Sequence, residues 1–329
     1  MASSFCECVG VELPVVLAPM GGAVGAKLAA AVSNAGGLGV LPLWGGDVEN
    51  LRKVVRQTKS LTAKPFAVNL NMDFPQEKLL DACLDEGVPI ISFFWRDPTP
   101  LIRKAKDAGA IVLHSVGDAE AARKAVDSGV DAIVAQGWEA GGHVRGTVAT
   151  LPLVPAVVDA VGDVPVIAAG GIADGRGLAA VLALGASAAW IGTRFLASEE
   201  VEIHPDYQQR VLDASENDTT HHNDLFNVGW PDAPHRVLRN STVDLWETEG
   251  RPPRGDRPGE GEVIARSPSR GEILRYQSYT PGPDAEGNIE ALSMWAGQGL
   301  SMVRKVQPAA EIINEIVNDA KSILNRVTV

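Results

Sequence analysis

The sequence of 329 residues is poor in aromatic side chains, in cysteine and in long apolar runs. No stretch reaches the roughly 18 unbroken apolar residues that a membrane-spanning helix requires, so we expect no membrane partner. A surplus of basic residues is also absent, because the net charge at pH 7 is −12. Nucleic acids and anionic membrane surfaces bind basic patches, so this charge argues against either partner.

The three cysteines cannot all pair within one chain, and their positions argue against even one disulfide. Cys6 and Cys8 are too close together for an easy bridge, and Cys83 lies in a helical pattern. The first ten residues contain neither the basic segment nor the apolar segment of a secretory signal. We therefore predict a reduced, cytoplasmic protein.

Glycine, in contrast, is abundant, with 34 residues, and the 45% of apolar residues is ordinary for a folded protein. In the first 195 residues, short apolar runs typical of strands alternate with amphipathic runs typical of helices. The predicted strands are Val15–Ala18, Leu38–Leu41, Phe66–Leu70, Ile90–Phe94, Ile111–His114, Ala132–Gln136, Val166–Ala169 and Ala188–Gly192. The predicted helices are Gly25–Asn34, Val48–Thr58, Gln76–Glu86, Pro98–Ala108, Asp118–Ser128, Leu151–Val161 and Asp174–Leu184.

This alternation predicts an α/β fold of parallel strands joined by crossover helices. A closed (β/α)8 TIM barrel and an open doubly wound sheet both fit, and the count of eight evenly spaced units favours the barrel. In such a barrel the functional loops follow the C-terminal ends of the strands. Polar residues and glycines do follow the predicted strands, which supports the same choice.

The rest of the chain has a different pattern. His204–Ala214 has helical spacing, and residues 247–271 form a Pro-, Gly-, Arg- and Glu-rich segment, either a long loop or locally disordered. Glu311–Leu324 is a clear amphipathic helix. We predict a barrel over 1–200, a helical and loop cap over 201–305, and a last outer helix over 306–329, so that the cap is inserted before this helix.

Glycine-bearing turns follow the seventh and eighth predicted strands. They comprise Ala169-Gly170-Gly171 and Gly192-Thr193. In barrels these two loops often bind a phosphate through backbone N–H groups and a helix N-terminus, and glycine allows the close approach. The alternative is that these glycines merely form tight turns.

A histidine on a glycine-rich arm follows the sixth strand. Gln136 ends that strand, and Gly141-Gly142 carries His143 beyond it. Such a histidine is placed for proton transfer or anion recognition, and the alternative is an ordinary surface residue. The turn Pro19-Met20-Gly21 after the first strand is suited to meet a flat ring.

Two further strand ends carry polar side chains. Asn69 can bind a ring nitrogen or carbonyl, or equally cap its own turn. His114 and Ser115 follow the fifth strand, and a site-lining role for His114 is as probable as a structural one. His221-His222 lacks further ligands at metal-site spacing, so we predict no metal site. His204 and His235 are expected at a helix start or on the surface.

Taken together, these motifs resemble the nitronate monooxygenase family, formerly called 2-nitropropane dioxygenases. The stretches that carry the resemblance are Ala18–Gly21, Ala29–Gly39, Lys64–Leu70, Ala135–His143, Ile167–Ile172 and Gly192–Leu196, with a weaker likeness at Trp295–Gln298. No Rossmann fingerprint, Walker A loop or nucleophile elbow stands in its proper context, which argues against NAD-binding domains, P-loop NTPases and α/β-hydrolases.

The resemblance implies an FMN-dependent oxidoreductase that oxidises alkyl nitronates with O2 to a carbonyl compound and nitrite. His143 matches the family's active-site histidine. FMN would lie across the mouth of the barrel, with candidate contacts at Pro19, Met20, Gly21, Asn69, His114, Ser115, Gln136, Gly141, Gly142, Ala169, Gly170, Gly171, Gly192 and Thr193. A protonated or hydrogen-bonding His143 would hold the nitronate anion.

Several alternatives remain open. The resemblance extends to FMN-dependent enoyl-ACP reductases and to NAD(P)H:quinone reductases, and a non-catalytic flavin-binding protein is a third possibility. After His143 the sequence is longer by one residue than the usual family pattern, and Arg145 there adds an anion contact or faces solvent. A monomer and a homodimer both fit the sequence.

Overall fold

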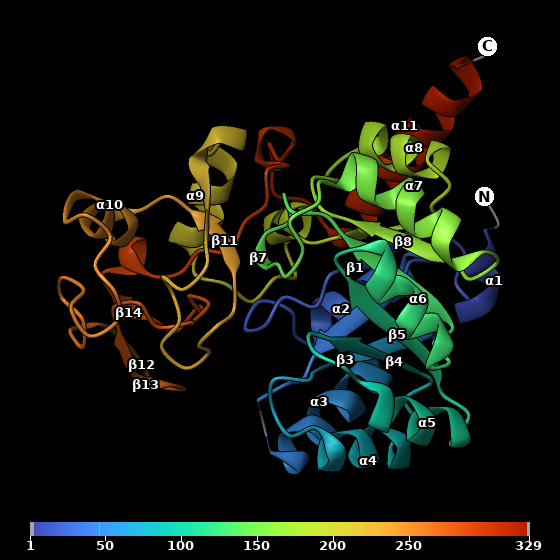
Figure 1. Ribbon diagram of the computed structural model, residues 1–329, viewed down its shortest axis with the longest axis horizontal. Helices are drawn as coiled ribbons and strands as arrows, with labels where there is room; N and C mark the ends of the chain where they lie inside the picture. The colour runs from blue at the N-terminus through green and yellow to red at the C-terminus, as the bar shows by residue number, and fades with distance from the viewer. Residues whose placement is uncertain (1–2, 46, 328–329) are drawn as a thin grey trace.

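The computed structural model describes residues 3–45 and 47–327 and contains a closed parallel barrel with a second lobe beside it (Figure 1). The barrel strands pair in the order β1-β9-β8-β6-β5-β4-β3-β2. The ring closes where the Leu17 N–H donates to Leu38 O at 2.9 Å. The α/β barrel prediction is therefore confirmed, and the open doubly wound alternative is wrong.

The barrel strands fall within two residues of the predicted ones at either end. They are β1 (Val15–Leu17), β2 (Gly39–Pro42), β3 (Phe66–Asn71), β4 (Ile90–Phe94), β5 (Ile111–Val116), β6 (Ala132–Gln136), β8 (Val166–Ala169) and β9 (Ala188–Ile191). The helices outside them are α2 (Ala26–Asn34), α3 (Val48–Leu61), α4 (Glu77–Asp85), α5 (Thr99–Asp107), α6 (Ala119–Asp127), α7 (Thr150–Val161) and α8 (Gly175–Ala183).

Strand alternation divides the apolar residues of the barrel into two layers. Val16, Ala67 and Ile90 belong to the cluster that fills the interior, whereas Val15 and Val68 pack against the outer helices. The short helix α1 (Ser4–Val9) packs with the interior cluster through its buried Phe5, Cys6 and Val9. No sequence pattern predicted this helix.

The last helix, α11 (Ala309–Arg326), packs against α8 and α2 and so completes the outer ring of helices. The chain between β9 and α11 leaves the barrel, and we call residues 199–308 the cap. Its helices and strands are α9 (Pro205–Asp213), β10 (Thr219–His222), β11 (His235–Leu238), α10 (Ser241–Thr248), β12 (Val263–Ser267), β13 (Gly271–Leu274) and β14 (Glu286–Gly287). Short 3-10 turns connect them: η2 (Glu216–Asp218), η3 (Ile289–Ala291) and η4 (Leu300–Met302), with η1 (Thr193–Ala197) just before the cap.

A loop of the barrel enters the sheet of the cap. The two-residue strand β7 (Gly142–His143) pairs with β11 in the antiparallel order β10-β11-β7, with His143 opposite His235. In Figure 1, β7 and β11 meet between the barrel and the cap. The loop after β6 therefore belongs to both lobes.

The structure changes two expectations for the cap. His235 lies in β11 and is fully buried, so its expected place at a helix start or on the surface is wrong. His204, in contrast, does cap the start of α9. The segment 247–271 begins in α10 and contains strand β12, with an ordered loop between them. Among the described residues, no helix combines the length and the apolarity that crossing a membrane requires.

Candidate active site

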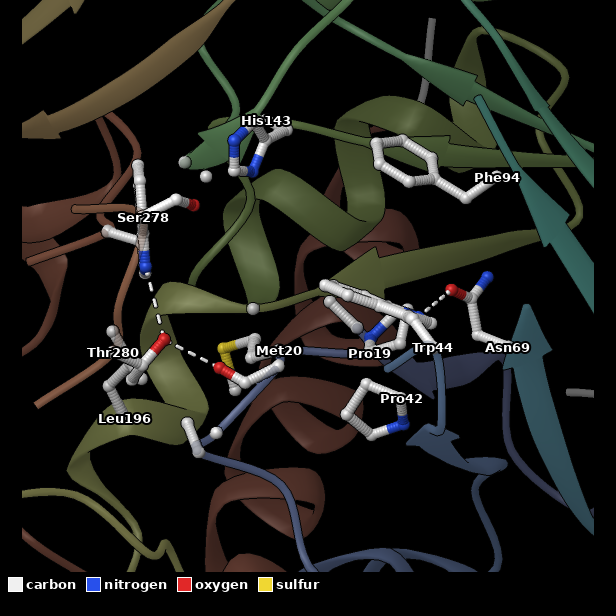
Figure 2. Close-up of a pocket in the computed structure, with 18 of the residues that line it drawn as sticks. Pro19, Met20, Pro42, Trp44, Asn69, Phe94, His143, Leu196, Ser278 and Thr280 are labelled. Carbon is white, nitrogen blue, oxygen red and sulfur yellow. Dashed lines mark hydrogen bonds between the residues drawn. The ribbon is translucent and has the colours of Figure 1, made fainter. Parts of the chain in front are cut away.

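A cavity of about 1050 Å³ opens at the C-terminal ends of the barrel strands and extends under the cap (Figure 2). Its volume is at the upper end of the range for small-molecule sites, which is about 300–1,000 Å³. The position agrees with the rule that barrel enzymes place their sites at this end. The cavity is thus the candidate active site.

Inward-facing positions at the strand ends form the floor of the cavity. Because side chains alternate along a strand, Asn69, Ser115 and Gln136 all point into the barrel at its upper rim. The predicted site residues that line the cavity are Pro19, Met20, Gly21, Asn69, Ser115, Gln136, Gly141, Gly142, His143, Ala169, Gly170, Gly171, Gly192 and Thr193. The fold therefore brings together residues that are far apart in sequence.

His114 is the exception among the predicted residues, since it does not line the cavity. It precedes Ser115 on β5, so alternation turns its side chain toward the outer helices. There it is buried, its Nδ1 lies 3.1 Å from the Phe93 carbonyl oxygen, and burial lowers its pKa to about 4. The position fits a structural role for His114 rather than a site-lining one.

The turns after β8 and β9 form a glycine cradle. Gly170 and Gly171 have φ values of 111° and 69°, which side-chain-bearing residues rarely adopt. A Cβ on Gly170 would come within 2.8 Å of Thr150 Oγ1. Thr193 lies across the cradle, where its Oγ1 accepts a hydrogen bond from the Gly297 N–H at 3.0 Å.

The N-terminus of α8 does not contribute to this cradle. Asp174 already caps α8, because its Oδ1 accepts hydrogen bonds from the N–H groups of Arg176 and Gly177. A carboxylate at this place would repel a phosphate and occupies the amides that would bind it. A phosphate group would therefore meet the backbone of the glycine turns, of which Gly192-Thr193 opens the 3-10 turn η1.

The backbone of His143 is fixed on both sides. Gln136 Nε2 donates to the His143 carbonyl oxygen at 3.1 Å, and β11 pairs with the opposite edge. Gly141 makes the approach to the cap possible, because a Cβ there would come within 2.4 Å of the Gly297 nitrogen. Gly142 adopts a φ of 71°. The glycine-rich arm is therefore held in one position.

The His143 imidazole lies between two indoles. Its centroid is 3.7 Å from that of Trp230, at an interplanar angle of 29°, and 5.0 Å from that of Trp295. Within the described residues, its Nε2 is buried and has no hydrogen-bond partner. Burial, together with the neighbouring His235, lowers the pKa of His143 well below 6.5. Of the two states expected above, this lowered pKa favours the neutral, hydrogen-bonding imidazole.

An aromatic wall faces the cavity. No sequence pattern predicted it. We use this name for Trp44, Phe74, Phe94, Trp230 and Trp295, all of which line it. Trp230 is the centre of the wall, with centroids 6.0 Å from Trp44 and 5.8 Å from Phe74. Phe94 ends β4, and the other four residues come from two barrel loops and two cap loops, so no periodic pattern marks the set. The available sequence signal for this wall was the scarcity of aromatic residues in the chain, because several of the few that it has gather at this cavity.

Asn69 is hydrogen-bonded at both ends of its amide. Its Oδ1 accepts a hydrogen bond from Trp44 Nε1 at 2.7 Å, and its Nδ2 donates to Ser92 Oγ at 3.0 Å. Both ends of the amide are therefore engaged within the protein. Trp44 also covers the first turn, because a Cβ on Gly21 would come within 2.8 Å of its ring (Figure 2). Trp44 must move for a ligand to reach Asn69.

The remaining candidates lie outside the cavity. Arg145 is exposed and faces solvent. His221 and His222 lie on β10, where His221 packs near Trp138 rather than toward the site. Within residues 3–45 and 47–327, no group of three or more His, Cys, Asp or Glu side chains is arranged to hold a metal ion.

Comparisons with known proteins give a consistent picture. The model of the nitronate monooxygenase family matches residues 3–82 and 73–319. A nitronate monooxygenase of Pseudomonas aeruginosa is 31% identical over 370 residues, covering 98% of this chain and all of that protein. A (3aS,4S,5R,7aS)-5-hydroxy-7a-methyl-1-oxo-octahydro-1H-indene-4-carboxyl-CoA dehydrogenase of Rhodococcus jostii is 41% identical over 251 residues, covering 76% of this chain and 69% of that protein.

Among solved structures, FabK from Thermotoga maritima superimposes with a TM-score of 0.85 at 34% sequence identity. The match covers 99% of this chain and 98% of that one, so barrel and cap are both shared.

Proposed function

The chain belongs to the nitronate monooxygenase family, and on that premise we propose that it is an FMN-dependent enzyme that oxidises alkyl nitronates. Two nitronates and one O2 would give two carbonyl compounds and two nitrites, which balances atoms and charge. The observation that carries the proposal is the placement of His143 beside the glycine cradle in one large cavity.

The cavity residues fit a flavin mononucleotide. The backbone of Gly170–Gly171 and of Gly192–Thr193 would hold its phosphate, because the three glycines have no side chain that blocks a close approach. Pro19, Met20 and Gly21 offer a flat apolar surface for its ring once Trp44 has turned away. FMN supplies the electron transfer, and the chain binds, orients and excludes water.

His143 would act on the substrate as a neutral group. A neutral imidazole holds the nitronate oxygens through a hydrogen bond rather than through an ion pair. The aromatic wall keeps water away from the anion, and this strengthens the hydrogen bond. The same neutral ring is able to accept a proton from a nitroalkane carbon.

Purification and substrate comparison test this proposal. We expect a bound flavin that is released on denaturation and identified as FMN by chromatography, and oxygen uptake with nitrite release on addition of propionate-3-nitronate. The absence of flavin would overturn the proposal. Nitronate turnover far slower than NADH or NADPH oxidation would overturn the nitronate assignment.

A His143→Ala variant tests the catalytic role. We expect it to retain FMN and to lose most turnover, by roughly 100-fold or more. His221→Ala is the matched control, because His221 is also partly buried but lies outside the cavity. Unchanged turnover in His143→Ala would refute the role that we assign.

A second candidate is an NAD(P)H-dependent oxidoreductase that acts on acyl thioesters, with FMN in the same place. The size of the cavity and its aromatic wall favour it, because they suit a bulkier apolar substrate than a small nitronate. In the described part of the chain, Arg270 is the one Lys or Arg side chain that lines the cavity, at its cap side, where an anionic tail could bind. NAD(P)H oxidation that accelerates on addition of an unsaturated acyl-CoA would select this candidate.

A further inference from the structure

Three side chains in contact, Asp73, Trp230 and His143, connect a barrel loop with the candidate active site through the cap. Asp73 lies in the turn after β3, and its Oδ2 accepts a hydrogen bond from Trp230 Nε1 at 2.6 Å. Trp230 belongs to the cap, and its indole stacks on the His143 imidazole at 3.7 Å. The link crosses the boundary between the two lobes at the cavity.

The Asp73 end of this link is itself fixed. Arg96, in the loop after β4, forms an ion pair with Asp73, whose side chain is only 6% exposed. The Asp73 N–H donates to Asn71 Oδ1 at 3.1 Å. A buried carboxylate that is held by a cation and a backbone contact presents its second oxygen in a defined direction.

The backbone beside the link is strained. Trp95 and Arg96 have φ values of 69° and 22°, which bulky residues avoid. This conformation brings the buried Trp95 ring to 5.6 Å from Trp230 and 6.2 Å from His143. Strain of this kind persists where surrounding contacts compensate for it, and it is common at functional sites.

In the part of the chain that the structure describes, no hydrogen bond orients the ring of His143. Active-site histidines usually donate one ring N–H to a carboxylate or carbonyl that fixes their orientation. Here Nε2 is buried without a partner among the described residues, and the close contacts of the ring are the indoles of Trp230 and Trp295. Whatever fixes the Trp230 indole therefore also fixes the imidazole.

We infer that Asp73 is a positioning residue, which orients His143 through the indole of Trp230. Its hydrogen bond to Nε1 sets the rotation of the indole, and the stacked indole sets the plane of the imidazole. The barrel thus controls a histidine that the cap covers. The inference rests on the proposed role of His143 for its effect on turnover, but the positioning itself is a property of the fold.

A double-mutant cycle tests the inference with nitronate turnover of the flavin-loaded enzyme. We expect Asp73→Ala and Trp230→Phe each to lower kcat/KM by roughly 10- to 100-fold, the size of effect that misplaced catalytic groups produce. Because both act through one hydrogen bond, the double variant should be no worse than Trp230→Phe alone. Fully additive losses would overturn the inference.

Two further variants sharpen the cycle. Asp73→Asn keeps an oxygen that accepts the indole N–H and should recover most of the activity, so recovery no better than with Asp73→Ala would contradict the inference. Trp246→Phe is the matched control, because the Trp246 Nε1 donates to the Pro252 carbonyl at 2.8 Å elsewhere in the cap. It should leave kcat/KM unchanged.

A spectroscopic readout separates positioning from activity. In Asp73→Ala, the imidazole resonances of His143 should shift in a histidine-selective NMR spectrum, and those of His221 should remain in place. Unshifted His143 resonances would overturn the inference. If the wild type oxidises no nitronate, the proposed function fails, and this measurement still decides the positioning role of Asp73.

Discussion

The barrel and the cap are stabilised by different kinds of contact. Barrel strands bury aliphatic side chains on both faces, and helices such as α3, α6 and α8 begin at aspartates that cap them locally. The cap has strands of two to five residues and depends on buried polar side chains with distant partners. In the cap, Arg236 and Arg257 are almost completely buried.

Neighbouring residues in the sequence specify the structure of the barrel units, whereas residues far apart in the sequence specify the structure of the cap. A barrel unit needs a repeating pattern and a capping residue, which any similar sequence can supply. A cap loop needs one particular partner from elsewhere in the chain, as Asn240 needs the Leu292 carbonyl, 2.8 Å from its Nδ2. Substitutions of polar side chains should therefore have small, local effects in the barrel and large effects at a few positions of the cap.

The largest effect on stability is expected at Arg257. Its guanidinium donates to the Leu225 carbonyl at 2.8 Å and to Asn227 Oδ1 at 3.0 Å, and pairs with Glu260. Breaking a buried pair costs about 3–5 kcal/mol, so Arg257→Ala should destabilise the cap by that order. The measurement is chemical denaturation with limited proteolysis to locate the unfolded segment.

Arg52→Ala is the matched barrel control for that variant. Arg52 pairs with Asp85 and Glu86 near the barrel surface, where water and salt weaken ion pairs. We expect only a small change in stability. A loss as large as that of Arg257→Ala would contradict the contrast between the lobes.

The next largest loss of stability is expected at the junction between the barrel and the cap. A Cβ at Gly141 would meet backbone atoms of Ala296 and Gly297, which cannot move aside easily. Gly141→Ala should destabilise the protein by about 2–3 kcal/mol and weaken flavin retention, because it separates the loop of His143 from the cap. Thermal unfolding and flavin content measure both effects.

Gly142→Ala provides the comparison at the neighbouring position. A Cβ there would meet nothing within 4 Å, so its cost is limited to the φ of 71°. This strain costs about 1–2 kcal/mol. If Gly142→Ala is the more damaging variant, the backbone contact at Gly141 does not hold the lobes together.

Acid should weaken the cap more than the barrel, because the cap buries two histidines with strongly lowered pKa values, His222 and His235, and the barrel strands bury one, His114. Burial lowers the pKa of His235 to about 4 and that of His222 to about 3, whereas the unfolded chain has a value near 6.5. The unfolded state therefore binds protons first, so the stability is complete above pH 6.5 and is lost as the pH falls toward 4. The expected loss for each group is about 2 kcal/mol by pH 5 and on the order of 3 kcal/mol by pH 4.

Hydrogen exchange at pH 7.5 and pH 5 measures this difference region by region. His235→Gln should remove part of the acid sensitivity of the cap, and His114→Gln should affect the barrel alone. If the barrel strands open first in acid, the buried histidines of the cap are not the cause.

The smallest effect is expected at a barrel helix start. Asp118 caps α6 by accepting a hydrogen bond from the Ala121 N–H at 2.8 Å. Asp118→Ala should cost about 1 kcal/mol in thermal unfolding, and Asp127→Ala, an exposed change in the same helix, should cost less. Equal losses of stability in the two variants would mean that the N-cap residue Asp118 contributes nothing to the stability of α6.

Sequence patterns predicted the barrel well, because its signals are local. β4, β6 and β8 match the predicted strands residue for residue, since turn residues bound each apolar run. Helix α1 was not predicted, because six residues are too few for a periodic signal. The burial of His235 was not predicted either, because its hydrogen-bond partners lie in other segments. One of them is the Phe226 N–H, which donates to His235 Nε2.

The candidate site divides in the same way. The floor at Gln136 and Ser115 followed from strand ends and alternation, whereas the glycine turns and His143 were marked by their own motifs. The wall around Trp230 has no such common signal, since the end of β4 and four separate loops supply it. Alternation also explains why His114 points away while its neighbour Ser115 lines the cavity.

The sequence by itself determined a barrel with glycine turns and polar strand ends at one rim, because periodicity and chain reversal are written in neighbouring residues. The tertiary structure alone decided the state of His143. Packing of a barrel loop against the cap placed its ring between Trp230 and Trp295, and burial there keeps it neutral. Such an environment depends on residues about 90 to 150 positions away, which no local pattern encodes.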